Sequence, residues 1–300
     1  MQENKDKKDT KDNWLHQLQS KKYLQALSPN RAVYFLGEVP QAGFRINFFF
    51  FKVDYYVCDT QPVPLFCRGL RIVVWDKREV ENSEEAGNIK IKDMKIKGWL
   101  QVKWPFKPGR PHIAYLDNIQ IKKENYFKNW SKTLKYYRHK WLKNLENKNI
   151  EIVEVDINTF IEFYKKANMS FYLKRFFTKQ MQNFKKVYKE DMHFYLIKDL
   201  LKDEKENVIA GTCILDDKEI GQAIYMYVFT YKRSEYKYIG VGIIDFCVQY
   251  AIKNNLNILN LTAIYTKGQD KTWRGFTEFK MHFDPKIAKY NDTFVKFTLN

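Results

Sequence analysis

The sequence predicts a mixed α/β protein of the α+β class, built from two domains. Its 300 residues exceed the length of one typical domain, which is about 100 to 200 residues. Hydrophobic residues make up 45% of the chain and aromatic residues 17%, enough for each domain to bury a core. From residue 150 onward, segments with strand and helix periodicity follow one another regularly, whereas strand-like segments dominate the first half.

The first half opens with a lysine- and aspartate-rich tail, residues 1–13, that we expect to be disordered. A helix is predicted over residues 14–27, because Ser28-Pro29 would end it. The run from Ile46 to Val57 is aromatic and β-branched, and its length predicts one long, bent strand within residues 44–58. Similar composition predicts the other strands of this half, at residues 33–39, 66–75, 95–103 and 112–121.

A long amphipathic helix is predicted over residues 124–148, where large apolar side chains recur at steps of three and four. Its other face is basic and carries Lys128, Lys132, Lys135, Arg138, Lys140 and Lys143. This face is either a solvated helix surface or a surface that binds anions. We expect the helix to end the first domain, so that the domains span residues 14–148 and 149–300.

The second half begins with a predicted strand at residues 150–155 and two helices at 158–167 and 172–188. Alternating apolar residues separated by polar turns then predict three strands. The remaining elements alternate in type. In chain order, the three strands and these elements are strands at 192–198, 207–216 and 221–231, a helix from 240 to 254, a strand at 257–262, a helix at 271–281 and a strand at 292–299.

The charge balance favours anionic partners, since 52 Lys and Arg residues stand against 35 Asp and Glu residues, a net charge of +17. Nucleic acid, nucleotide phosphates and anionic membrane surfaces all fit this charge, which can also reflect a compositional bias. The four cysteines and five histidines show no metal-ligand spacing, so we expect no metal site. No apolar stretch predicts a membrane span or a signal peptide, and we expect a cytoplasmic protein.

A glycine-containing segment, Lys237-Tyr-Ile-Gly240-Val241-Gly242, falls between a predicted strand and a predicted helix. At such a position, backbone N–H groups and the helix dipole can hold a phosphate, and glycines let the main chain approach it. We therefore predict that Lys237, Gly240, Val241 and Gly242 bind the phosphates of a donor. The alternative is an ordinary loop with two turn glycines.

The element order β-α-α-β-β-β-α-β-α-β from residue 150 resembles the GNAT superfamily. In that family the loop after the fourth strand holds the pyrophosphate of coenzyme A through the motif Q/R-x-x-G-x-G/A. The segment that ends in Gly240-Val-Gly242 lies at the matching place. Lys237 stands where the family has Gln or Arg, a departure that keeps the positive charge.

A second resemblance is to the Fem-type aminoacyltransferases. It rests on the segment from Trp273 to Phe283, which contains Phe279-Lys280, and on Tyr115-Leu-Asp117-Asn with the following helix. It covers residues 112–300 and implies two GNAT-like lobes, each a mixed, mostly antiparallel sheet flanked by helices. Fem proteins move an amino acid from aminoacyl-tRNA to an amine of a peptidoglycan precursor, without a metal.

The Fem resemblance implies that Lys280 is the lysine of the catalytic region and that Phe279 lines the same pocket. A fixed ammonium suits acyl transfer because the transition state gathers negative charge on the former carbonyl oxygen. The alternative is a lysine placed near a helix end by the helix dipole. Asp117 is a candidate base for the acceptor amine, although aspartates at strand ends are commonly turn residues.

Three further residues are predicted to bind the acceptor. Arg175, on the second helix of this half, can meet a phosphate or carboxylate through two hydrogen bonds, or can simply face solvent. Tyr225 and Tyr227 alternate on a predicted strand and can offer a phenol to a leaving group, or can be packing residues.

The leading hypothesis is therefore a Fem-like N-acyltransferase with no tightly bound cofactor. Its donor would be aminoacyl-tRNA, for which the basic helix offers a surface, or an acyl-coenzyme A. Its acceptor would be an amine, and the resemblance implies an amine of a peptidoglycan precursor. An acyl-CoA-dependent GNAT N-acetyltransferase is the first alternative. A basic nucleic-acid-binding protein that keeps the fold without catalysis is the second.

Overall fold

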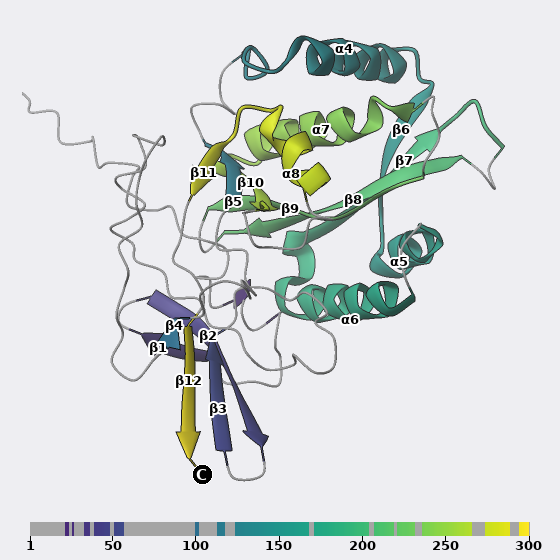
Figure 1. The fold of residues 1–300 in the computed structure, drawn as a ribbon. Coiled ribbons are helices and arrows are strands. Elements are labelled where there is room, and N and C mark those ends of the chain that lie inside the picture. The colour runs from purple at the N-terminus through teal and green to yellow at the C-terminus, as the bar shows by residue number, and fades with distance from the viewer. Residues whose placement is uncertain are drawn as a thin grey trace, which may run out of the picture.

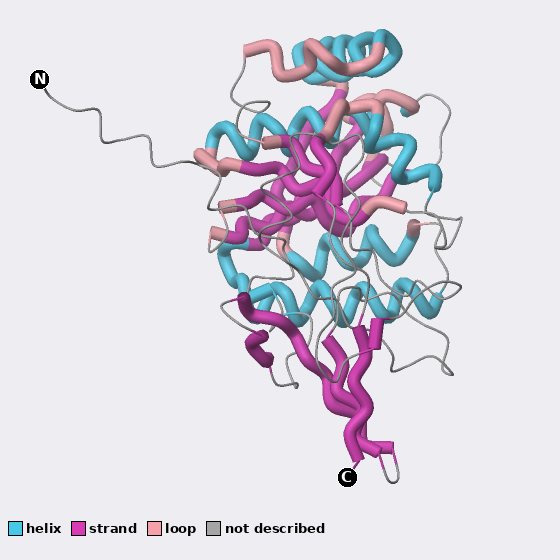
Figure 2. The backbone as a smooth tube through the Cα atoms, turned by 60° about the vertical axis from the view of Figure 1, so that its left-hand side comes forward, coloured by secondary structure: helices cyan, strands magenta, loops and turns pink. Residues whose placement is uncertain are grey.

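The structure is a computed structural model that describes residues 22–23, 26, 33–36, 39–48, 51–56, 100–101, 113–117, 124–167, 171–203, 207–218, 221–231, 236–265, 274–288 and 294–299. Within these residues the strands form one sheet of five and one of seven (Figure 1). Helices cover both faces of the larger sheet, and the smaller sheet lies on its α6 side (Figure 2). The predicted mixed α/β fold is confirmed.

The smaller sheet is antiparallel throughout. Its strands, in spatial order, are β1 (Val33–Leu36), β2 (Val39–Phe48), β3 (Phe51–Tyr56), β12 (Phe294–Leu299) and β4 (Leu100–Gln101). The prediction of a single bent strand through residues 46–57 is wrong, because Phe48 pairs with Phe51 and the run is a hairpin. Residues 48–51 are all Phe, so no glycine, proline or asparagine signalled the reversal.

The larger sheet contains six pairs of neighbouring strands. Five pairs are antiparallel, and the pair β9–β10 is parallel. Its strands, in spatial order, are β11 (Lys286–Ala288), β5 (Ile113–Leu116), β10 (Ile258–Ala263), β9 (Gln222–Thr230), β8 (Val208–Asp217), β7 (Met192–Asp199) and β6 (Ile150–Val155). The predicted strands of the second half all occur. The three-residue β11 was not predicted, because so short a strand has no detectable alternation.

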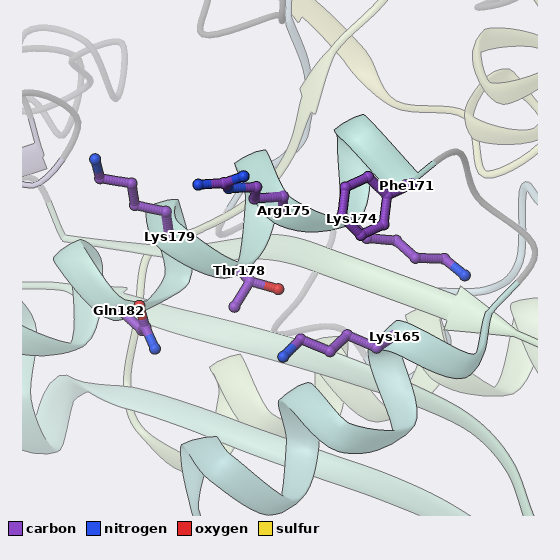
Figure 3. Close-up of a pocket in the computed structure, with 7 residues that line it drawn as sticks. All are labelled: Lys165, Phe171, Lys174, Arg175, Thr178, Lys179 and Gln182. Atoms are coloured by element: carbon purple, nitrogen blue, oxygen red, sulfur yellow. The ribbon is translucent and has the colours of Figure 1, made fainter.

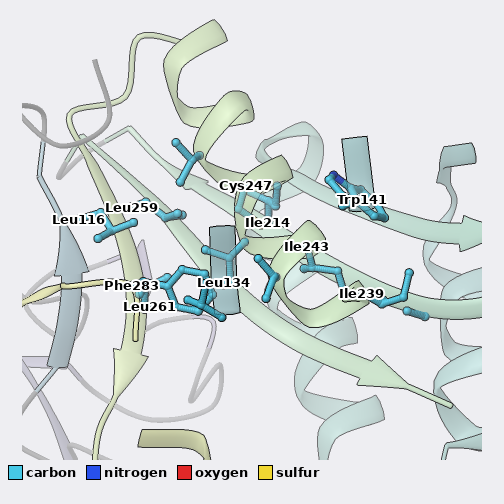
Figure 4. Close-up of a cluster of buried hydrophobic side chains, with 14 of the residues drawn as sticks. Leu116, Leu134, Trp141, Ile214, Ile239, Ile243, Cys247, Leu259, Leu261 and Phe283 are labelled. Atoms are coloured by element: carbon cyan, nitrogen blue, oxygen red, sulfur yellow. The ribbon is translucent and has the colours of Figure 1, made fainter. Parts of the chain in front are cut away.

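Two helix layers enclose this sheet. On one face lie α5 (Ile157–Lys166) and α6 (Phe171–Tyr188), which pack over a core that includes Phe160, Phe184 and Phe194. On the other face lie α7 (Ile239–Lys253) and α8 (Arg274–Met281), and α4 (Lys132–Glu146) covers α7 from outside (Figure 1). The second core, around Ile214, Ile243 and Leu261, fills this side (Figure 4).

The helix predicted over residues 124–148 begins only at Lys132. Ser131 caps it, because the Ser131 side-chain oxygen accepts a hydrogen bond of 3.3 Å from the Leu134 N–H. Phe127 and Trp130, expected on the helix, lie in the turns before it. Trp130 is nonetheless buried and its ring meets the ring of Phe283, with centroids 4.8 Å apart.

Close contact between α4 and α7 depends on Gly242. A Cβ atom at Gly242 would lie 2.2 Å from Trp141 Cδ2, far inside van der Waals contact. Buried residues occur on all sides of α7, which is typical of a helix covered on two sides. Gly242 is therefore required so that the indole of α4 can rest on the first turn of α7.

The expectation that Arg138 belongs to a solvent-facing basic surface is wrong. Arg138 forms an ion pair through Nε with Asp245 on α7, and Asp245 is 2% exposed. The Tyr126 hydroxyl donates to the same carboxylate over 2.5 Å, and Arg138 Nη2 donates to the Tyr126 oxygen over 3.1 Å. Burial disfavours the charge of Arg138, but Asp245 and Tyr126 together outweigh burial and raise the pKa of Arg138. Burial beside the same carboxylate raises the pKa of Tyr126 to about 12.

The chain crosses between the two sheets. β5 and α4, which precede residue 149, belong to the larger sheet and its cover, whereas β12 completes the smaller sheet. The division into domains at residue 149 stays a prediction. In the described part of the chain, no helix is both long and apolar enough to cross a membrane.

We expect Gly242→Ala to destabilise the protein by about 1–3 kcal/mol, because the new methyl group would push Trp141 and α4 away from α7. Urea unfolding measures the effect. Gly275→Ala on α8 is the matched control, since no atom lies within 4 Å of its Cβ position and alanine favours a helix by about 0.5–1 kcal/mol. Equal stability of the two variants would contradict the proposed contact.

Arg138→Met should cost about 3–5 kcal/mol, because it leaves the buried Asp245 carboxylate without its cation. Lys135→Met removes an exposed charge from the same helix and should change stability by less than about 0.5 kcal/mol. Thermal unfolding at one ionic strength compares the two. A similar loss in both variants would mean that the ion pair is not what fastens α4 to α7.

Candidate active site

The sheet opens between its two parallel strands. β9 and β10 pair over three positions, Gln222–Ile258, Ala223–Leu259 and Ile224–Asn260. Beyond them β9 continues to Thr230 beside β8 alone, and β10 continues to Ala263 beside β5 alone. We call this the β9–β10 separation. Ligands of α/β proteins commonly bind where neighbouring parallel strands part at their carboxyl ends, so this is the candidate active site.

Both strands carry an irregularity at the separation. In β9 the register shifts between the pairs Cys213–Met226 and Gly211–Phe229, and Tyr227 has φ 47°. In β10 it shifts between Asn260 and Ala263, and Thr262 has φ 66°. A β-bulge leaves a residue outside the ladder and costs backbone strain where a side chain has positive φ. Two such bulges face the same separation.

The bulge in β9 places the two predicted acceptor tyrosines on opposite faces of the sheet. Tyr225 packs into the core beneath α7, whereas Met226 and Tyr227 both pack into the core beneath α5 and α6. The Tyr227 hydroxyl donates to Gln180 Oε1 on α6 over 2.7 Å. Burial raises the pKa of both phenols, so neither readily releases a proton.

The first turn of α7 lies within the predicted donor segment, residues 237–242. Lys237 is exposed, and the N-cap Tyr238 makes no side-chain hydrogen bond to the helix. No acidic residue lies in the first turn, and the N–H groups at the start of a helix can donate hydrogen bonds to an anion. The two glycines serve packing as well: Gly242 admits Trp141, and the Cβ position of Gly240 lies 3.3 Å from Phe279 Cζ. Val241 is buried, so only its backbone can meet a ligand.

Lys280 fixes the bulge of β10. It is 7% exposed, and its Nζ donates to the Ala263 carbonyl over 2.8 Å and to Thr262 Oγ1 over 3.2 Å. Thr277, also on α8, accepts from the Tyr265 N–H over 2.6 Å. The structure thus brings the end of β10, Phe279-Lys280 and the first turn of α7 together, an arrangement that the two sequence motifs did not predict.

Asp117 lies at the other end of β10. It follows β5, in which Leu116 pairs with Leu259, so Asp117 lies level with the beginning of β10, about 13 Å along the strand from Thr262. Its Oδ2 atom forms an ion pair with Lys286 Nζ over 2.5 Å, which ties β5 to β11. Burial, with Asp117 nearby, raises the pKa of Tyr115 to about 12. The structure does not bring Asp117 and Lys280 together.

Arg175 is exposed on α6, on the opposite side of the sheet from α7. It lines a groove with Lys165 of α5 and with Phe171, Lys174, Thr178, Lys179 and Gln182 of α6 (Figure 3). Sequence patterns gave no sign of this groove, nor of the bulges at Tyr227 and Thr262, because all three depend on contacts between distant segments. In the described residues no group of His, Cys, Asp and Glu side chains could hold a metal ion.

No protein-family model and no curated protein sequence matches this chain. Among solved structures, FemX aligns with a TM-score of 0.64 and 11% identity, over 94% of this chain and 92% of FemX. The C-terminal domain of a protein from Agrobacterium fabrum, assigned as a lysylphosphatidylglycerol synthetase, aligns with a TM-score of 0.50 and 10% identity, over 92% and 87% of the two chains. This chain has a GNAT-like, Fem-type fold. Identities this low establish the Fem-type fold alone.

The β9–β10 separation can be compared with the element order of the GNAT resemblance. The resemblance puts the donor loop after the fourth strand of the GNAT order, and the structure has β9 there, followed by α7. The predicted donor segment and Phe279-Lys280 flank the β9–β10 separation, whereas Arg175 and Asp117 lie elsewhere. The site roles of all these residues stay predictions.

Lys280→Met should lower stability by about 1–3 kcal/mol, because the half-buried Ala263 carbonyl and Thr262 hydroxyl would lose a hydrogen-bond donor. Lys237→Met, at an exposed lysine, should change stability by less than about 0.5 kcal/mol. Chemical unfolding of both variants measures this. An unchanged midpoint for Lys280→Met would show that the ammonium does not hold the β10 bulge.

Proposed function

We propose that the protein is an N-acyltransferase that moves an acyl or aminoacyl group from a phosphate-bearing donor to an amine. The observation that carries this proposal is the β9–β10 separation, with the uncapped first turn of α7 at one side and Lys280 at the end of β10. The start of α7 suits the phosphates of a donor, and a buried cation attracts the negative charge that develops on the carbonyl oxygen during acyl transfer.

In the proposed reaction, the amine nitrogen attacks the carbonyl carbon of the donor. A C–N bond forms and the C–O or C–S bond to the carrier breaks, while the amine nitrogen loses a proton and the leaving oxygen or sulfur takes one up. The carbonyl oxygen gathers negative charge in between, so fixed N–H donors near it lower the barrier. The bulge of β9 at Tyr227 releases main-chain groups from the ladder and is our candidate for that role.

In this proposal the main role of Lys280 is to hold the end of β10 in place. Its ammonium is already bonded to Ala263 and Thr262, and it holds β10 in the bulged shape that keeps the separation open. Its charge, buried in a low-dielectric region, also attracts developing negative charge at longer range than a solvated lysine could. The first turn of α7 would meet the donor phosphates, with Lys237 beside it.

The outer face of α4 favours aminoacyl-tRNA as the donor. Lys132, Lys135 and Lys143 are exposed there, with Tyr136 63% exposed between them. This face continues to the donor segment, since Lys140 Nζ lies 5.0 Å above the Tyr238 ring. Lysines along a helix bind nucleic-acid phosphates without regard to sequence. The acceptor implied by the Fem resemblance is an amine of a peptidoglycan precursor.

An acyl-coenzyme A is the second candidate donor, supported by the uncapped first turn of α7, which can hold a pyrophosphate without help from α4. The two donors are distinguished by parallel assays with a panel of amines. One follows amine-dependent loss of radiolabelled amino acid from tRNA, and the other follows release of the coenzyme A thiol. Turnover of neither donor with any amine would leave only the non-catalytic binding protein.

Lys132→Gln/Lys143→Gln should weaken tRNA binding and reduce the slope of log K against log salt by up to about 1.8, near 0.9 for each lost phosphate contact. Filter binding at several salt concentrations measures the slope. Lys186→Gln/Lys253→Gln removes the same charge from exposed positions on α6 and α7 and should leave the slope unchanged. If both pairs reduce the slope equally, net charge rather than the α4 face attracts tRNA.

A further inference from the structure

Two buried amide side chains join β9 to β10 just before the strands part. Asn260 of β10 and Gln222 of β9 are both 0% exposed, and Asn260 Nδ2 donates to Gln222 Oε1 over 3.0 Å. Alternation along the strands places both side chains on the same face as Ile258 and Ile224, which belong to the core beneath α5 and α6. The amide pair therefore lies in largely apolar surroundings.

Stability alone does not account for this pair. Polar side chains lose their hydrogen bonds with water on burial, so two apolar side chains of the same shape are often at least as stable in such a place. Asn260 makes one further bond, because its Oδ1 atom accepts the Thr262 N–H over 2.7 Å. The amide pair is thus connected to the bulge of β10.

Thr262 is held from both faces of the sheet. It lies in the β10 bulge, where the register with β5 shifts and φ is 66°. Asn260 binds its N–H from the face of α5 and α6, while Lys280 of α8 donates to its Oγ1 atom over 3.2 Å from the other face. Because its N–H is occupied, Thr262 cannot donate to a carbonyl of β9 and extend the parallel ladder beyond the pair Ile224–Asn260.

The sheet becomes accessible directly after the amide pair. β9 is an interior strand, yet its residues 225–228 are half-buried, and so are Thr262 and Ala263 on β10. Gln222, Ala223 and Ile224, which pair with β10, are buried, and β8 is buried along its whole length. The last paired position therefore marks the inner end of the β9–β10 separation.

We propose that Asn260 is a positioning residue for acyl transfer and that Gln222 fixes the orientation of its amide. By occupying the Thr262 N–H, Asn260 ends the ladder and keeps β10 at the distance from β9 at which the donor carbonyl and the amine meet. This role rests on the proposed function. A displacement of about 1 Å between reacting groups can slow a reaction about a hundred-fold, so a small movement of β10 is enough to affect the rate.

The main test is Asn260→Leu/Gln222→Met, which replaces both amides with apolar side chains of similar shape. The midpoint of urea unfolding should equal or exceed that of the unchanged protein. The kcat for acyl transfer should nevertheless fall at least about ten-fold, because the β10 bulge is no longer fixed. The KM for the donor should change by less than about two-fold, since the first turn of α7 is untouched. An unchanged kcat in this variant would overturn the proposal.

Tyr250→Phe on α7 is the control, because it removes a hydrogen bond of 3.0 Å to the buried Asp216, outside the separation. It should lower the unfolding midpoint and leave kcat unchanged, the reverse of the double variant. An equal loss of kcat in both would show that the rate follows core packing in general, and the proposal would fail.

Two single variants serve if the double variant does not fold. Gln222→Glu keeps an oxygen that accepts from Asn260 and should retain kcat within about three-fold. Gln222→Met leaves the Asn260 amide without this acceptor and should lower kcat further than Gln222→Glu does. Equal kcat in these two variants would refute the role of Gln222 in orienting Asn260.

Amide hydrogen exchange at Thr262 distinguishes this proposal from the proposed function, because no donor is needed. The Thr262 N–H should exchange at least about ten-fold faster in the double variant than in the unchanged protein. Unchanged exchange would overturn the role of Asn260 whether or not the protein transfers an acyl group. Faster exchange in a protein that turns over no donor would refute the proposed function and the role in transfer, while Asn260 would still hold the bulge.

Discussion

The larger sheet depends on the short parallel contact between β9 and β10. Three paired positions hold the strands together, and two bulges then direct them apart. Strands that part expose main-chain groups that would otherwise be paired, so the arrangement lasts only if neighbouring elements hold each strand from outside. β8 does so for β9. β5 does so for β10, with the side chains of α8 fixed to its last residues.

The elements around this separation are fastened by a few specific contacts. Lys280 holds the bulge of β10, and Tyr227 links the bulge of β9 to Gln180 on α6. Trp141 presses α4 onto the glycine of α7, while the buried pair Arg138–Asp245 prevents the two helices from sliding. Positive-φ residues at both bulges indicate strain that these contacts must outweigh. Rigid support of this kind is what a site needs when it aligns a reactive carbonyl.

Much of the second half could be predicted from sequence, because its strands alternate cleanly and its helices have apolar faces, as in β6, α5 and β8. The contact of Phe279 with Gly240 was not predicted, because the two motif segments are distant in the sequence. Local sequence patterns did not predict three features of the structure. These are the Phe48–Phe51 pairing, the helix start after Ser131, and the burial of Arg138 against Asp245. The face of Tyr227 was unpredictable because a bulge reverses alternation without leaving a mark in composition.

The pairing of β12 with β3 and β4 bears on how the chain acquires its structure. β12 is an interior strand of the smaller sheet, yet it consists of residues 294–299, while its neighbours come from residues 51–56 and 100–101. The smaller sheet cannot be completed until β12 has been synthesised, and the residues of the larger sheet are synthesised before β12. Contacts that span so much chain form slowly, so β3 would wait with an unpaired edge. Chaperone binding during translation would be most useful at that stage.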